Sequence, residues 1–202
     1  MKFEEFDYPC FYLDSNKASL KSQSIYKRFT LAILFILFTS TILSSLNINA
    51  TTRWEYLDKL NGWLVLLSGT GSIILLNSKF EKKWYIGRAV SESIKTISWK
   101  YMMKSEPFDL VIDKANRELF ISRVSEILSK AQQLGFIPAL NSIHSDPITK
   151  KMDALRNMNF TERKSIYASH RIEDQIKWYA KKSITNKNKS NVFGFLMIIG
   201  IE

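Results

Sequence analysis

The sequence predicts an all-α membrane protein with an N-terminal transmembrane helical hairpin, a cytoplasmic helical region and the start of a further transmembrane helix. The main observation is that no charged residue occurs between Arg28 and Arg53, or between Lys59 and Lys79. Since about 18–20 helical residues cross the hydrocarbon core of a bilayer, each block is long enough to span it. A pair of buried soluble helices is the alternative, but uncharged runs of this length are uncommon in a small soluble domain.

The predicted organisation follows the alternation of apolar and charged stretches. We expect a cytoplasmic juxtamembrane tail over 1–28, transmembrane helices over 29–48 and 60–77, a cytoplasmic helical region over 79–190 and an incomplete third transmembrane helix over 191–202. The last apolar run is too short as a helix to cross a bilayer. We therefore expect the sequence to be a shortened form of a longer parent; the alternative is that its end inserts only partway into the bilayer.

The net charge of +10 predicts the orientation of the hairpin. The basic excess lies after the second apolar block, and Lys27 and Arg28 lie just before the first. Because basic segments tend to stay on the cytoplasmic side, we expect the N-terminus and residues 79–190 in the cytoplasm. Nucleic-acid binding is the other interpretation of a basic region, but the interleaved acidic residues favour solvated helices near anionic lipid, so no nucleic-acid partner is expected.

A glycine-containing stretch within the second block raises the question of a phosphate loop. Gly69 and Gly71 are not followed by the lysine of a phosphate-binding loop, and a dinucleotide loop would need a third spaced glycine. Small residues on one helix instead allow another helix to approach closely in lipid. The predicted seam consists of Ser68, Gly69, Gly71 and Ser72 with Ser40 and Ser44 of the first block. It either packs the hairpin or lines an oligomeric seam or pore.

The residue types that carry most catalytic and metal chemistry are scarce. The chain has one cysteine and two histidines, and His170 has no obvious nucleophile nearby in the sequence. Glu92 and Asp174 have basic neighbours that suit salt bridges better than acid–base chemistry. We therefore expect no catalytic residues, no metal site, no cofactor and no enzymatic activity.

Two polar-aromatic faces are predicted on the cytoplasmic helices. A helix over Glu81–Glu106 ends before Pro107, and one over Asp109–Leu134 ends at Gly135. Residues 136–160 are expected to be irregular, before a third helix over Thr161–Thr185. The first face, on the first of these helices, consists of Arg88, Glu92, Lys95 and Trp99. The second, on the third, consists of Tyr167, Arg171, Asp174, Gln175, Trp178 and Lys182, with Tyr179 beside it.

We expect these two faces to meet. Arg171 or Lys182 would pair with Glu92, and Trp99 and Trp178 would cap the contact. The alternative is two ordinary amphipathic helices with solvated charges.

Two strings within these helices resemble a known family. The string E-S-x-K-x-x-x-W-x-Y-x-x-x-x-x-P-F, which includes Tyr101, Pro107 and Phe108, and the string R-I-x-D-Q-x-x-W-Y-x-x-K resemble the domain-of-unknown-function 4231 family. That family belongs to the SLATT group, the SMODS- and SLOG-associating two-transmembrane effector domains. The resemblance covers residues of roughly 25 to 202, and the chain departs from the pattern by stopping inside the third membrane segment.

The resemblance implies a prokaryotic-type membrane protein of conflict and nucleotide-signalling systems. Such domains are proposed to form pores or disrupt membranes, which kills or arrests an infected cell. We therefore expect the bilayer, further copies of the chain as a homo-oligomer, and a sensor or nucleotide-signalling protein as partners. The alternative is a non-conducting anchor or scaffold whose basic cytoplasmic helices recruit a partner.

Overall fold

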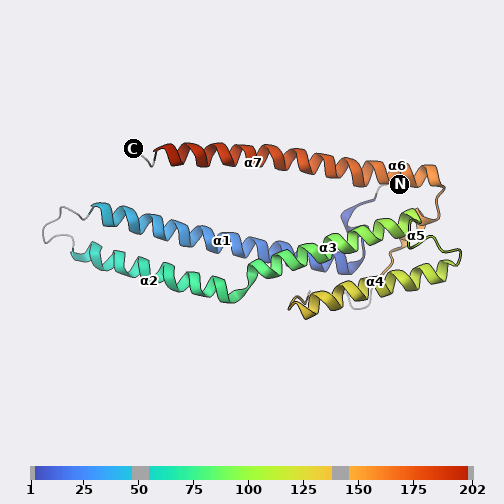
Figure 1. Cartoon of the computed structure of the whole chain (residues 1–202), viewed down its shortest axis with the longest axis horizontal. Coiled ribbons are helices and arrows are strands. Elements are labelled where there is room, and N and C mark those ends of the chain that lie inside the picture. Colours follow the sequence, from blue (N-terminus) through green and yellow to red (C-terminus); the bar gives the residue numbers. More distant parts are fainter. Residues whose placement is uncertain (1–2, 47–54, 138–145, 200–202) are drawn as a thin grey trace. The chain divides into compact units, whose positions relative to one another are not determined.

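The computed structural model describes residues 3–46, 55–137 and 146–199, and all of its regular elements are helices, so the all-α class is confirmed (Figure 1). A short 3-10 helix, Glu5–Asp7, precedes the long helix α1, Cys10–Leu46. The other elements are α2, Glu55–Ser78; α3, Phe80–Met103; α4, Asp113–Gln133; α5, Lys150–Arg156; α6, Phe160–Tyr167; a π-helical segment, Ala168–Ile172; and α7, Glu173–Ile199.

Two stretches of the described helices are long and apolar enough to cross a membrane. They are Cys10–Ser45 and Tyr56–Met103, and only 6% of the most apolar window of each is buried inside the structure. The core helix of a soluble protein would be mostly buried, so the low burial favours lipid over a soluble core. α1 begins at Cys10, so most of the predicted tail is helical and continuous with the first span.

The chain divides into two compact units. The hairpin unit consists of Pro9–Lys95 and Ile121–Pro147, and the signature unit consists of Met1–Tyr8, Thr96–Phe120 and Ile148–Glu202. The division falls after Lys95 in α3 and after Phe120 in α4, so each of these helices contributes to both units.

In the hairpin unit, α1 packs along α2, and the first part of α3 packs against the N-terminal part of α1. Lys79 has a φ of 54°, which separates α2 from α3. Gly87 on α3 lies close to other residues, because a Cβ atom there would be 2.8 Å from the ring of Phe136 and 3.0 Å from Cβ of Ser19. Ser19 also donates a hydrogen bond to the carbonyl of Trp84 at 3.0 Å.

In the signature unit, an apolar core joins α3, α4 and α5. Its fully buried members are Tyr101, Met102, Phe108, Phe120, Ile148, Met152 and Leu155. The rings of Tyr101 and Phe120 are 5.2 Å apart, and those of Tyr101 and Phe108 are 5.9 Å apart. The half-buried Pro107 precedes Phe108 in the turn after α3.

The observed helix ends agree with the prediction at Gly135 and differ from it elsewhere. α3 ends at Met103, before Pro107, where Lys104 has a φ of 52°. Gly135 has a φ of 82° and follows α4 closely, as a helix-stopping glycine does. The stretch expected to be irregular contains α5, which Thr149 caps by accepting a hydrogen bond from the amide of Met152.

Candidate functional site

Within the hairpin, polar side chains of α1 and α2 bond to one another. Ser40 donates a hydrogen bond to the amide oxygen of Asn61, and the amide nitrogen of Asn61 donates to Ser44 at 2.7 Å. Ser40 is 5% exposed, so this contact lies between the helices. Apolar surroundings make an unpaired amide costly, and both ends of the Asn61 amide have partners here.

The remaining seam residues lie on different faces of α2. A Cβ atom on Gly71 would meet Ile33 of α1 at 3.4 Å, and Ser68 is 3% exposed. Ser68 and Ser72 donate to the carbonyls of Val65 and Ser68, both at 2.8 Å, so their hydroxyls are satisfied within α2. A Cβ atom on Gly69 would have nothing within 4 Å, and Gly69 is exposed. Ser40, Ser44 and Gly71 thus pack the hairpin, whereas Gly69 faces away from it.

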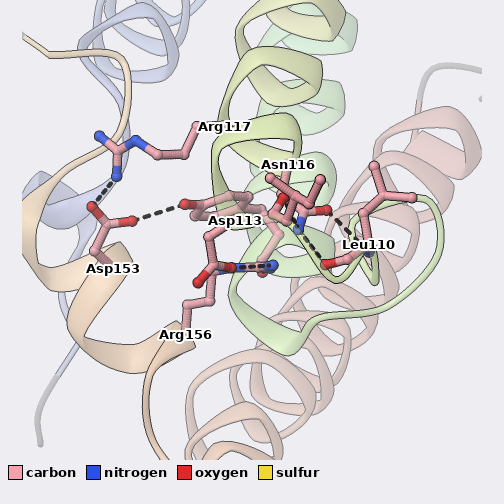
Figure 2. A network of polar contacts seen from close by, with 8 residues as sticks. Leu110, Asp113, Asn116, Arg117, Asp153 and Arg156 are labelled. Atoms are coloured by element: carbon pink, nitrogen blue, oxygen red, sulfur yellow. Dashed lines mark hydrogen bonds and ion pairs between the residues drawn. The ribbon is translucent and has the colours of Figure 1, made fainter.

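In the signature unit, two arginines and two aspartates join α3, α4 and α5 (Figure 2). Arg156 is 3% exposed and donates to the carbonyl of Tyr101 at 2.6 Å and to one oxygen of Asp113 at 3.2 and 3.4 Å. Its guanidinium also lies 4.6 Å from the centre of the Tyr101 ring. Asp153 accepts hydrogen bonds from Arg117 and, at 2.8 Å, from the Tyr101 hydroxyl. Burial and the bond to Asp153 raise the pKa of Tyr101 to about 12.

Asn116 holds the turn before α4 in place (Figure 2). Its side chain is fully buried, donates to the carbonyls of Leu110 and Ile112, and accepts from the amide of Leu110 at 3.3 Å. The Leu110 amide and the carbonyls of Leu110 and Ile112 are therefore paired, while the apolar side chains of this turn stay outside, with Val111 fully exposed.

Trp99 is the centre of an aromatic cluster in the signature unit. It is 3% exposed, and its indole nitrogen donates to the hydroxyl of Tyr8 at 2.7 Å. The rings of Phe3 and Tyr167 lie 5.5 and 5.3 Å from that of Trp99. The sequence predicts that Trp99 and Trp178 cap the contact between the two polar-aromatic faces. The ring contacts described for Trp99 come from the N-terminal segment and α6, so a shared contact with Trp178 stays a prediction.

A pocket of about 350 Å³ opens beside this cluster. Trp99 and Tyr167 form its aromatic wall, and Met103 lies beside them. The polar lining groups are the cations Lys100 and Arg171 and the hydroxyls of Thr96 and Ser105. Among the described lining residues none is acidic, so the pocket suits an anion better than a cation.

The rest of the second polar-aromatic face lies on α7, beyond the π-helical segment. Trp178 is 44% exposed, contacts the ring of Tyr179 at 4.9 Å and lies under the amine of Lys182. The predicted single face assumed a regular α-helical repeat from Tyr167 to Lys182. Because the π turn adds almost one residue, it rotates α7 relative to α6, and Asp174 and Gln175 follow the rotated register.

The first polar-aromatic face is divided between the units. Arg88 pairs with Glu92 at 2.8 Å, and Lys95 lies 5.8 Å from the Tyr12 ring, all within the hairpin unit. Arg171 and Lys182 belong to the signature unit. Their pairing with Glu92 therefore stays a prediction.

Several residues of these networks are absent from the sequence-based site. Asn61 could have been noticed as an amide inside an uncharged block, a position that usually has a polar partner in lipid. Thr149 caps α5, the helix that carries Asp153 and Arg156. A threonine in this position is a helix-start signal, and it could have indicated this helix in the sequence. Tyr8 carried no comparable signal, because its partner Trp99 is far away in the sequence.

Comparison with protein families agrees with this architecture. The family SMODS and SLOG-associating 2TM effector domain 3 matches residues 9–164, well over half of the chain. The chain belongs to this family. Its SLATT membership is thereby confirmed, and it implies a membrane effector of conflict systems.

The extent of the match differs from the resemblance noted in the sequence. It begins before α1, covers the hairpin and the string from Glu92 to Phe108, and ends within α6, so the string from Arg171 to Lys182 lies outside it. Neither the curated proteins nor the solved structures contain a match to the chain.

Proposed function

We propose that this SLATT protein oligomerises through its hairpin and permeabilises the membrane when its cytoplasmic helices receive a signal. The main support is a row of small and apolar residues on the face of α2 that points away from α1. A Cβ atom on Gly62 or Gly69 would meet nothing within 4 Å, and the two glycines lie seven residues apart. Residues at that spacing share a face of a helix, and small residues let a second helix approach closely in lipid.

The neighbours of these glycines extend the same face. Leu66, Ile73 and Leu76 are 59%, 60% and 79% exposed, so nothing within the described hairpin covers them. A second hairpin packed there would bury this row while leaving the bonds of Asn61 to Ser40 and Ser44 intact. We place the N-terminus and residues 79–190 in the cytoplasm, where the basic excess would face anionic lipid and a sensor partner.

The test separates helix association from hairpin folding. Gly69→Leu should fill the close-approach surface without touching α1, because no atom lies within 4 Å of the new Cβ. Thr70→Leu is the matched control, since it adds a similar side chain to an exposed position about 100° around the same helix. Membrane potential after induced expression in bacteria is read with a voltage-sensitive dye, and membrane-bound protein is quantified alongside.

We expect depolarisation by the wild type and by Thr70→Leu, and its loss with Gly69→Leu at equal membrane insertion. Equal depolarisation by both variants would refute the proposed seam. If the wild type causes no depolarisation even when a signalling partner is co-expressed, permeabilisation itself is refuted.

A non-conducting anchor is the second candidate, and α7 favours it. Its described side chains are largely exposed, with Trp178, Tyr179 and Ile184 at 44%, 64% and 63% beside several lysines. An exposed face of aromatic and basic residues suits a protein partner. Replacing α1 and α2 by an unrelated transmembrane hairpin would preserve the function of an anchor and abolish that of a pore.

A further inference from the structure

We propose that the pocket of the signature unit binds a small phosphate ester, with Lys100 and Arg171 contacting its phosphate group. The volume of about 350 Å³ exceeds that of a lone phosphate, so the ligand carries an organic group as well. This role concerns binding by the signature unit and requires no membrane permeabilisation.

The lining chemistry selects the anion. Arg171 supplies a planar fork of donors that matches two phosphate oxygens, and Lys100 supplies a compact charge. The hydroxyls of Thr96 and Ser105 add neutral donors. Trp99 and Tyr167 form an aromatic wall, against which the organic group of the ligand can pack.

A second observation, independent of the pocket, is the state of Arg163. Its side chain is 9% exposed, and the buried Nε and Nη1 atoms have no hydrogen-bond partner among the described residues. Burial, followed by the nearby charge of Arg156, lowers the pKa of Arg163. A buried guanidinium with unsatisfied donors and a like-charged neighbour is costly, so a bound anion in its vicinity would stabilise it.

The helix geometry relates Arg163 to the pocket. Arg163 lies four residues before Tyr167, and Arg171 lies four residues after it, with the π-helical segment from Ala168 in between. In a regular α-helix two such steps drift around the axis, but a π turn contains nearly one residue more. The segment therefore brings Arg171 back into line with Arg163 and Tyr167, so both cations share the helix face of Tyr167, with Arg171 lining the pocket and Arg163 one turn before Tyr167, outside the lining.

The test measures binding to the full chain in uncharged detergent micelles by isothermal titration calorimetry. The soluble probes are inorganic phosphate, glycerol 1-phosphate and adenosine monophosphate, with adenosine as the uncharged comparison. A second arm measures binding to phosphatidylcholine vesicles with and without phosphatidylglycerol, which distinguishes a lipid headgroup from a soluble ester. In either arm the phosphate-bearing form should bind and its uncharged counterpart should not.

The variants assign the binding to the pocket. Arg171→Gln should weaken binding of the phosphate ester by about tenfold or more, the usual effect of losing a charge-assisted hydrogen bond. Lys182→Gln is the matched control, since it removes one positive charge from α7 without lining the pocket. Lys100→Gln, at an exposed position, serves if circular dichroism shows that Arg171→Gln has lost helicity.

The binding results support or overturn the phosphate site as follows. Loss with the pocket variants and binding within about twofold of wild type for Lys182→Gln support the site, whichever arm supplies the phosphate. The absence of binding in both arms overturns it. So does an equal loss with Lys182→Gln, because general charge attraction would then explain the binding.

Discussion

The ion pair between Arg156 and Asp113 predicts an asymmetric response to substitution. Arg156 is 3% exposed, whereas the side chain of Asp113 is 67% exposed. Among the described residues, Asp113→Ala leaves a buried guanidinium with the Tyr101 carbonyl and ring as its partners, while Arg156→Met leaves a carboxylate that water can solvate. Removing the carboxylate should therefore cost more through lost charge pairing than removing the guanidinium.

The size of the effect follows from the geometry. Two hydrogen bonds from Arg156 reach the same Asp113 oxygen, at 3.2 and 3.4 Å. Hydrogen bonds to charged groups contribute about 1.5–3 kcal/mol, and the length of these two and the exposure of Asp113 reduce that to about 1–2 kcal/mol. This loss corresponds to about 5–30-fold faster exchange of protected backbone amides.

Hydrogen exchange detected by mass spectrometry on the full chain in micelles measures this, read on peptides that cover α5. A double-mutant cycle with Asp113→Ala, Arg156→Met and both together isolates the pair, because the effect of Asp113 on the N-terminus of α4 is common to both backgrounds. The reasoning is refuted if Asp113→Ala leaves exchange in α5 within about twofold of wild type, or if the coupling energy is below about 0.5 kcal/mol.

Three further predictions concern other contacts. Gly87→Ala should destabilise the hairpin unit by about 1–3 kcal/mol, because the new Cβ would meet the Phe136 ring at 2.8 Å; thermal unfolding tests this, with Gly62→Ala, which meets nothing within 4 Å, as a control that should not destabilise. Asn61→Leu should weaken hairpin packing by about 0.6 kcal/mol per lost hydrogen bond to Ser40 or Ser44, measured by thermal unfolding in micelles; unchanged unfolding would contradict a role for these bonds. Stability should fall as the pH rises from about 10 to about 12, because unfolded tyrosine loses its proton in that window while Tyr101 keeps its own; Tyr101→Phe should remove this part of the slope in a pH series of unfolding curves.

The sequence by itself determined the helical class and the two long spans. An uncharged run that is long enough to cross a bilayer can be recognised in the sequence alone, because every residue of a lipid-facing helix must tolerate apolar surroundings. The end of α4 near Gly135 could also be predicted from the sequence, since a φ of 82° suits glycine and few other residues. The resemblance to the SLATT group rested on short strings and was confirmed by the family match over 9–164.

Only the tertiary structure decided which polar residues meet. Helical spacing placed Trp99 and Trp178 on comparable faces, but the π-helical segment changes the register between α6 and α7, and a regular repeat cannot show that. Trp99 contacts Tyr8 and Tyr167, and Trp178 contacts Tyr179 on its own helix. Long-range partners depend on how separate helices pack, so a face read from periodicity identifies residues that can form a contact and leaves the partner to the fold.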